Sequence, residues 1–469
     1  MQPDLRSEDL TDRSTSKDTK RQIDIKTHMS VDNDKGIFVD FTVEDSELFA
    51  LLKRQCENGV YIGFHYLNDT RVIKRGKHKI LCQRDEIGCT LLHYAAKGSI
   101  AILEEIIRTS NEVQLDIRCF QGQTVLDYAI KYQQKDMSEF LISKHKELLL
   151  DNSTSTSQGI NPFHWVAWHG DLSMFSVLTQ TDIDLKTKTK NGLNLLDIAI
   201  MRNKYEFCES MIENENMLQN DKQDECGWNV AHYAAFSNNV KVLQLLKSKN
   251  DSLIMAKTKT MKTTLHIACE YGNFEAASFI TEHFEDLLNC TDNLKWNALH
   301  YASKGGNTQI FHLLLEKGMD IASLTEEEKT VLHIACTSKQ VKICKQVAHI
   351  FYDDPENQWL INKETTNNKW MAAHYIGVEK KGDGSEEEIV DILLNCKAKL
   401  YKRTKQGWSV LDIAVDHLNV RLVKHLLSSI HYRTKFGISK ESLADNINKT
   451  KDKCISKILS NTLDEMTNQ

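Results

Sequence analysis

The chain has 469 residues, of which 41% are hydrophobic and 26% charged, a composition that excludes a largely disordered protein. The net charge of −6 provides no general basic field for nucleic acid or an anionic membrane. Three prolines and 20 glycines disfavour many-stranded β folds and favour helix. The N-terminus lacks a secretory stretch, no apolar run approaches the roughly 18 residues of a membrane span, and the twelve cysteines include no C-x-x-C pair. We therefore expect a cytoplasmic, intracellular protein without membrane insertion.

A short pattern, apolar-x-(His or Asp)-x-Ala, recurs along the chain in ten copies, two of them truncated. We call its central His or Asp the anchor. The spacing between anchors runs from 33 residues (164 to 197) to 41 (333 to 374), and the excess falls at insertions around 153–157, 352–360 and 380–386. The anchors are His93, Asp127, His164, Asp197, His232, His266, His300, His333, His374 and Asp412. Such a regular period predicts an array of similar structural units.

Each copy of the pattern predicts two helices. The residue three before the anchor is Thr, Asn or Ser in nine of ten copies, and Met371 in the other. These polar side chains cap helix N-termini, which places the anchor in the first turn of a short helix. Apolar residues 10, 11, 13 and 14 positions beyond the anchor have the spacing of a second amphipathic helix. Glycine stands five before the anchor in six copies, where a turn can use positive φ.

These features resemble the ankyrin-repeat family, whose unit of about 33 residues is a β-turn followed by a helix pair opened by T-P-L-H-x-A. The resemblance implies an all-α solenoid of stacked helix-turn-helix units with β-turn fingers. We expect a disordered polar tail at 1–35, an atypical N-terminal capping segment at 36–83, ten repeats at 84–430 and a degenerate capping repeat at 431–469. The ninth repeat is predicted to be degenerate and a candidate hinge. The motif proline occurs only at Pro162.

Seven anchors are histidines, which raises the question of a metal site. Equivalent residues in stacked units lie roughly 8–10 Å apart, too far to share a zinc ion with bonds of about 2 Å. A structural role, with the imidazole bonded to neighbouring backbone as in the ankyrin family, is the favoured interpretation. Cys269 and Cys336 follow the small residue of the pattern and are expected in the core. No phosphate-binding, dinucleotide-binding, metalloprotease or nucleophile-elbow motif occurs, so we expect no enzyme, metal or cofactor.

Aromatic residues occupy positions that, in the ankyrin family, face the concave groove where partners bind. Four of the seven tryptophans stand four before an anchor: Trp228, Trp296, Trp370 and Trp408. Four or five residues past an anchor come Tyr132, Trp168, Phe236 and Tyr271. Aromatic anchors dominate interface energetics, so these residues are candidate partner-binding residues, with Trp228, Phe236, Tyr271 and Trp296 favoured. The alternative, that each tryptophan packs on a neighbouring finger as structural cover, is equally open.

Basic residues cluster on the predicted fingers. The runs are Arg71 to Lys79; Lys186, Lys188 and Lys190; Lys257, Lys259 and Lys262; and Lys397, Lys399, Lys402, Arg403 and Lys405. Such runs are usually solvated loop faces. The alternative is that they bind an extended acidic protein segment with salt-sensitive affinity. Nucleic acid is disfavoured by the overall acidity.

The sequence favours a non-enzymatic protein-interaction scaffold or adaptor that docks a protein along the ankyrin groove. A second hypothesis is a dedicated subunit of a larger assembly, such as a recruitment subunit of a ubiquitin ligase or kinase, or a cytoskeletal or ciliary protein. An enzyme would need a catalytic group outside the repeats. The partner and the oligomeric state are not specified by the sequence.

Overall fold

The computed structural model describes residues 29–32, 36–39, 45–57, 81–109, 115–145, 159–179, 187–213, 223–378, 384–428 and 430–468. The chain divides into two compact units, which we call unit 1 (residues 1–226) and unit 2 (residues 227–469). Each is described by itself. Within the part of the chain that the structure describes, the helices are too short or too polar to cross a membrane.

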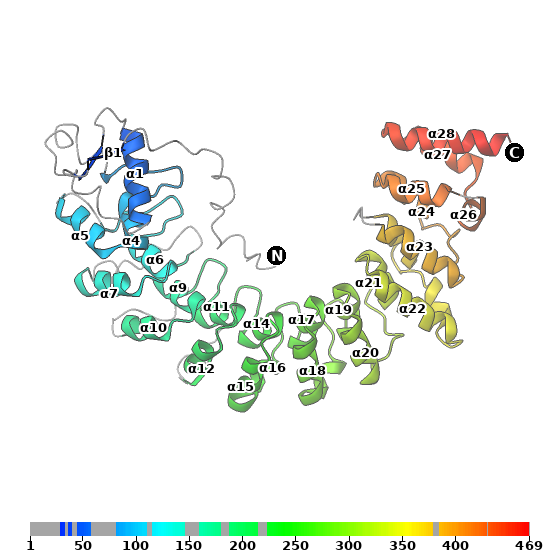
Figure 1. Ribbon diagram of the computed structural model, residues 1–469. Coiled ribbons are helices and arrows are strands. Elements are labelled where there is room, and N and C mark those ends of the chain that lie inside the picture. The colour runs from blue at the N-terminus through cyan, green and yellow to red at the C-terminus, as the bar shows by residue number, and fades with distance from the viewer. Residues whose placement is uncertain are drawn as a thin grey trace. The chain divides into compact units, whose positions relative to one another are not determined.

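Unit 1 consists of one small hairpin followed by helices (Figure 1). Its elements are β1 (Met29–Asp32), β2 (Gly36–Val39), α1 (Asp45–Glu57), α4 (Leu91–Gly98), α5 (Ile100–Thr109), α6 (Val125–Lys131), α7 (Lys135–Lys144), α9 (Pro162–His169), α10 (Leu172–Thr179), α11 (Leu195–Met201) and α12 (Tyr205–Glu213). The first helices α4, α6, α9 and α11 each pack on the next, and α5, α7, α10 and α12 each pair with the helix before them. This is the predicted stack of helix pairs.

The N-terminal part of unit 1 differs from the sequence prediction. Residues 29–32, expected within a disordered tail, form strand β1, which pairs antiparallel with β2 so that Val31 lies opposite Ile37. Pairing satisfies the backbone groups of a segment whose β-branched residues suit a strand. Residues 1–28, 33–35 and 58–80 lie outside the described residues. Helix α1 packs on α4, and Lys53 Nζ lies 3.1 Å from Asp85 Oδ2 at the base of the first helix pair.

Unit 2 continues the same architecture. Its elements are α14 (Val230–Phe236), α15 (Val240–Asn250), α16 (Ser252–Met255), α17 (Thr264–Tyr271), α18 (Phe274–His283), η4 (Glu285–Asn289), α19 (Ala298–Gly305), α20 (Thr308–Glu316), α21 (Val331–Thr337), α22 (Val341–Asp353), η5 (Gln358–Asn362), η6 (Ala372–Gly377), α23 (Ser385–Asn395), α24 (Val410–Asp416), α25 (Val420–Leu427), α26 (Ile430–Lys435), α27 (Lys440–Lys449) and α28 (Lys453–Thr467). The first helices α14, α17, α19, α21, η6 and α24 pack in succession, so an apolar core runs between the two helix layers of the unit.

The predicted ninth repeat is indeed irregular. Its first helix, η6, is a 3₁₀ helix rather than an α-helix, and residues 379–383 after it lie outside the described residues. The insertion ahead of it extends α22 to Asp353 and adds η5. A role of this repeat as a hinge stays a prediction, as do the capping roles of 36–83 and 431–469.

The predicted helix caps are confirmed. In eight first helices the residue three before the anchor accepts a backbone N–H with its side chain; these caps are Thr124, Asn161, Asn194, Asn229, Thr263, Asn297, Thr330 and Ser409. The sequence spacing of the second helices is also reproduced, since α10, α15, α20 and α25 cover the expected apolar positions. The all-α prediction thus holds outside the hairpin of unit 1.

The position five before the anchor needs positive φ in every finger of unit 2, with or without glycine. At Gly227, where φ is +83°, an added Cβ would lie 2.5 Å from the Lys259 backbone nitrogen. The next four fingers place non-glycine residues in the same left-handed region: Met261, Lys295, Glu328 and Lys369. This conformation costs a residue with a Cβ about 1–2 kcal/mol. The surrounding hydrogen bonds, rather than glycine, impose the turn.

Lys295 offers a test of that strain. We expect Lys295→Gly to be more stable than Lys295→Ala by about 1 kcal/mol, because only glycine relieves the left-handed backbone. Urea unfolding followed by circular dichroism measures the difference. At the control position Lys317, where φ is −78°, the order should reverse. Equal stability of the two Lys295 variants would contradict the strain at this turn.

Candidate protein-binding surface

The fingers of unit 2 are held by two sets of backbone hydrogen bonds. We define them as residues 258–263, 292–297, 325–330, 365–371 and 404–409. Within a finger, the first residue donates its N–H to the carbonyl just before the cap, as from Asp292 to Trp296 at 3.0 Å. Between fingers, Glu326 N–H donates to Leu294 O at 2.9 Å, and Lys405 N–H to Asn368 O at 2.9 Å. These backbone hydrogen bonds therefore fix the position of the Cα atom of the residue four before each anchor.

Four of the histidine anchors, His93, His266, His333 and His374, contact backbone with both ring nitrogens. In unit 2, His333 Nδ1 accepts the Thr330 N–H at 3.1 Å, and its Nε2 lies 3.3 Å from Trp370 O in the next finger. In unit 1, His93 makes the same pair of contacts, with the Thr90 N–H at 3.2 Å and Gln123 O at 3.2 Å. The structural interpretation of the anchors is confirmed. Among the described residues, no cluster of His, Cys, Asp or Glu has the arrangement of a metal site.

Burial keeps these imidazoles neutral. Desolvation lowers the pKa to about 4 at His93, His164, His266 and His300, and to about 3 at His333. The pKa of an aspartate anchor changes in the opposite direction. Burial raises the pKa of Asp127 to about 6, although the hydrogen bonds from Thr124 act to lower it. These five histidine anchors are therefore uncharged hydrogen-bonding groups near neutral pH.

Three of the four repeated tryptophans pack on a tyrosine of their own first helix. The ring centroids lie 5.2 Å apart for Trp228 and Tyr233, 5.3 Å for Trp296 and Tyr301, and 5.0 Å for Trp370 and Tyr375. Each tyrosine stands directly after its anchor. The tyrosine contact lies within one repeat, not on a neighbouring finger as the structural alternative supposed, and Trp228 is only 9% exposed. Trp408 differs, because its helix has Ile413 at the tyrosine position, and 39% of Trp408 is exposed.

Lysines fill the tryptophan position in the intervening repeats, a pattern that the sequence reasoning missed. Lys262 Nζ lies 4.8 Å from the Tyr301 ring centroid, and Lys329 Nζ lies 5.3 Å from that of Tyr375. Each lysine also pairs with a carboxylate, Glu270 at 2.7 Å for Lys262 and Glu327 at 2.6 Å for Lys329. The sequence does contain a signal for this pattern. In unit 2 the residue directly after the anchor alternates between Tyr in one repeat and Ile in the next.

Three candidate residues join into one aromatic chain. The Trp228 and Phe236 rings lie 5.9 Å apart, and the Phe236 and Tyr271 rings 4.6 Å apart, edge to face. Tyr271 is 38% exposed and Phe236 is half-buried. We call these three residues the aromatic chain. The fourth favoured candidate, Trp296, contacts Tyr301 and His300 of its own helix instead.

The remaining candidates lie apart from that chain. In unit 1, the Trp168 ring is covered by the Arg202 guanidinium at 4.0 Å, and it meets Trp165 edge to face. Tyr132 receives Lys97 at 4.4 Å on its ring. In unit 2, Trp370 packs on Tyr375 as described. A binding role for any of these aromatic candidates stays a prediction.

The two singled-out cysteines are core residues. Cys269 and Cys336 are fully buried, and desolvation raises the pKa of Cys269 well above the ordinary thiol value. Cys336 Sγ lies 3.8 Å from Cys344 Sγ on the neighbouring helix. Both side chains are enclosed in the core, where thiols are inert, so their expected structural role is confirmed.

Of the basic runs, Arg71 to Lys79 and Lys186 lie outside the described residues. Lys262 is neutralised by Glu270, and Lys402 and Arg403 lie within 4 Å of Glu364 and Asp412. Lys262, Lys402 and Arg403 of the basic runs therefore each have a carboxylate within ion-pair distance.

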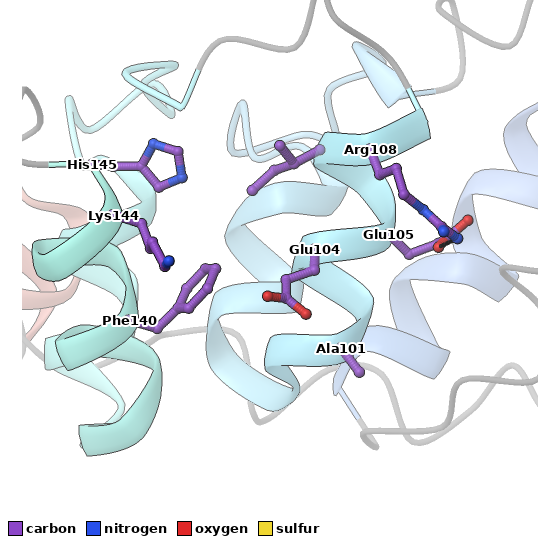
Figure 2. Close-up of a pocket in the computed structure, with 8 residues that line it drawn as sticks. Ala101, Glu104, Glu105, Arg108, Phe140, Lys144 and His145 are labelled. Carbon is purple, nitrogen blue, oxygen red and sulfur yellow. Dashed lines mark hydrogen bonds and ion pairs between the residues drawn. The ribbon is translucent and has the colours of Figure 1, made fainter.

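An open pocket of about 680 Å³ lies between the second helices α5 and α7 of unit 1 (Figure 2). It is lined by both signs of charge: Glu104 on α5 lies on the side of Phe140 and Lys144 on α7, whereas Glu105 and Arg108 point away from α7. Arg108 and Glu105 pair with each other. The pocket is a gap between neighbouring helix pairs of unit 1, and we assign no function to it.

Comparison with known proteins agrees with this architecture. The family model "Ankyrin repeats (3 copies)" matches residues 67–152, 196–287 and 265–358. The chain is 26% identical over 174 residues to the probable 26S proteasome regulatory subunit p28 of Saccharomyces cerevisiae, which covers 37% of this chain and 75% of that protein. It is 23% identical over 166 residues to the tyrosine-protein kinase HTK16 of Hydra vulgaris, covering 35% and 20%.

A third relative matches over a longer stretch. The human transient receptor potential cation channel subfamily A member 1 is 22% identical over 349 residues, covering 65% of this chain and 30% of the channel. The chain thus spans under a third of the kinase and of the channel. The matched segments of the family model, 67–152 and 196–358 when merged, together cover more than half of the 469 residues. With the anchors, caps and stacked helix pairs, they show that the chain belongs to the ankyrin-repeat family.

Proposed function

We propose that the chain is a non-enzymatic, intracellular scaffold that docks a protein partner on the finger and first-helix surface of unit 2. The observation that carries the proposal is the aromatic chain of Trp228, Phe236 and Tyr271. It ends in an exposed tyrosine on the surface that ankyrin repeats use for partners. Exposed aromatic side chains backed by a rigid, buried ring lose little entropy on binding and make strong interface anchors. The cysteines are free of disulfides, and this supports an intracellular location.

Tyr271 is the residue to test, because truncating the buried Trp228 would also damage the fold. Partners are captured by the full chain, identified by mass spectrometry, purified and measured by titration calorimetry. We expect Tyr271→Ala to weaken binding about thirtyfold, which corresponds to the loss of about 2 kcal/mol that marks a hot-spot residue.

Two controls make the result specific. Tyr271→Phe keeps the ring and should bind nearly as well as the parent chain. Tyr401→Ala removes a tyrosine that is more exposed than Tyr271 from another part of unit 2, and should leave this affinity unchanged. Normal binding by Tyr271→Ala, with an unchanged unfolding midpoint, would refute the assignment of the aromatic chain.

The second candidate function, a subunit of a larger assembly, is favoured by the similarity to the proteasome regulatory subunit, of which 75% is matched. The measurement that separates the two is the size of the native complex. A chain that elutes from a cell extract only in one large, salt-stable particle is an assembly subunit. A chain that is mostly separate and exchanges partners is an adaptor.

A further inference from the structure

Two neighbouring fingers of unit 2, together with the two residues just before the second finger, carry a group of exposed cations around one exposed tryptophan. We call Lys369, Lys402, Arg403, Lys405 and Trp408 the basic finger patch; all five side chains are exposed. The fingers 365–371 and 404–409 are held together by the Lys405 N–H to Asn368 O bond at 2.9 Å, and Gln406 Nε2 donates to Asn368 Oδ1 at 3.4 Å. The cations therefore project from a fixed backbone.

The positive charge of this patch is only partly balanced. Arg403 lies 3.2 Å from Asp412, and Lys402 lies 3.6 Å from Glu364. Across the described residues, Lys369 and Lys405 have no carboxylate within 4 Å. Elsewhere on the same surface, Lys262 and Lys329 are each neutralised by a glutamate and stacked on a tyrosine. The two unbalanced lysines are thus available to an external anion.

Trp408 adds an apolar contact next to these charges. It stands at the tryptophan position of the other repeats, but Ile413 replaces the tyrosine on which those rings pack. Its indole is therefore 39% exposed, compared with 9% for Trp228. A partly exposed indole is among the most favourable side chains for anchoring a partner.

The preceding finger has the opposite charge. Finger 325–330 carries Glu326, Glu327 and Glu328, and it is joined to finger 365–371 by the Thr366 N–H to Glu327 O bond at 3.2 Å. Glu327 and Glu328 pair with Lys329 and Lys363, and Glu326 is exposed. Across three adjacent fingers the surface thus changes from acidic to basic. An anionic ligand is attracted at one end and repelled at the other.

We propose that the basic finger patch docks an acidic segment of a partner protein. Its carboxylates lie over Lys369 and Lys405, and one apolar side chain packs on Trp408. The acidic finger fixes the register, because a carboxylate placed over Glu326 is repelled. This inference rests on the proposed scaffold function and names the chemistry of a partner segment at a second place on the same surface. A protein segment is favoured over RNA because a single exposed tryptophan and an adjoining acidic finger do not form a stacking track for successive bases.

The test uses the full chain and two short fluorescein-labelled peptides. One is an Asp/Glu peptide with a central leucine, and the other has Asn and Gln in place of the acids. We expect fluorescence anisotropy to detect the acidic peptide only, with affinity that falls as salt rises to about 0.15 M and above. Equal binding of the neutral peptide would overturn the proposal. So would patch-dependent binding of an RNA oligonucleotide or of phosphatidylserine vesicles when the acidic peptide does not bind.

Charge variants locate the binding site. The double variant Lys369→Glu, Lys405→Glu should lose at least tenfold in peptide affinity, Trp408→Ala should also weaken it, and Glu326→Lys should strengthen it. The matched control, Lys345→Glu with Lys424→Glu, makes the same charge change on exposed positions of the second helices α22 and α25, and should retain affinity. An equal loss in the control would overturn the proposal, because the effect would then follow net charge alone.

The same variants separate this inference from the proposed function. A captured partner that binds the Lys369→Glu, Lys405→Glu chain normally, but loses affinity with Tyr271→Ala, refutes the acidic-segment site and leaves the scaffold function intact. Loss in both variants supports both.

Discussion

Replacing Lys339 by methionine is expected to destabilise unit 2 by about 2–4 kcal/mol. This lysine is 3% exposed, and its Nζ donates to Tyr375 O at 2.8 Å and to Ile376 O at 2.7 Å. Those carbonyls end η6, the shortened first helix of the irregular repeat. Without the ammonium they are buried acceptors that lose a charged donor, at about 1–3 kcal/mol each. Methionine retains the aliphatic length and the left-handed backbone of Lys339, so the change isolates the two hydrogen bonds.

The matched control is Lys342→Met, which removes an exposed lysine from the first turn of α22, the helix that follows Lys339. Urea unfolding followed by circular dichroism gives the free energies, and hydrogen exchange of the amides in 372–377 reports η6 directly. We expect Lys339→Met to lower the midpoint and to speed exchange in η6, and Lys342→Met to do neither. Identical midpoints for the two variants would show that Lys339 does not hold this repeat.

Acid is expected to unfold the chain through its histidine anchors, over a window from about pH 6.5 down to about pH 4. In unit 2, burial lowers the folded-state pKa of His266 and His300 to about 4 and that of His333 to about 3, compared with about 6.5 in an unfolded chain. The unfolded state therefore binds protons first as the pH falls. The stabilisation is complete above pH 6.5 and is lost toward the folded-state pKa, by about 1.4 kcal/mol per pH unit for each histidine.

Unit 1 should respond less steeply. His93 and His164 act in the same direction, but Asp127 acts in the opposite one. Its folded-state pKa of about 6 lies above its unfolded value, so its protonation favours the folded state as the pH falls below 6. Unfolding free energies at pH 7, 6 and 5 measure the slope. His300→Asn keeps a neutral acceptor and should remove about one proton from the slope; an unchanged slope would contradict this assignment.

Much of the first-helix geometry follows from the sequence. A capping residue three before each anchor, and an anchor able to accept the cap N–H, determine where each first helix begins, and Thr330 with His333 shows the pair in the structure. The apolar spacing of the second helices is equally local. These features depend on residues a few positions apart, which is the range over which a sequence pattern is informative.

The candidate surface was less predictable, because it depends on contacts between repeats. Whether Trp228 is a binding residue or structural cover depends on Tyr233 and Phe236, whose positions relative to the indole follow only from the folded backbone. The two hydrogen bonds of the buried Lys339 ammonium join residues 36 or more positions apart in the sequence. A lysine in a sequence gives no sign of burial, since the residue type is almost always exposed.

The left-handed finger turns have a consequence for how such a surface can change. Because Met261, Lys295, Glu328 and Lys369 all adopt one backbone conformation, the charge and polarity of a fingertip are independent of its shape. A substitution at one of these positions changes the charge or polarity of the surface that a partner contacts, without moving the neighbouring fingers. The binding specificity of these finger turns can therefore be altered by one substitution at a time, while the backbone of the fingers stays the same.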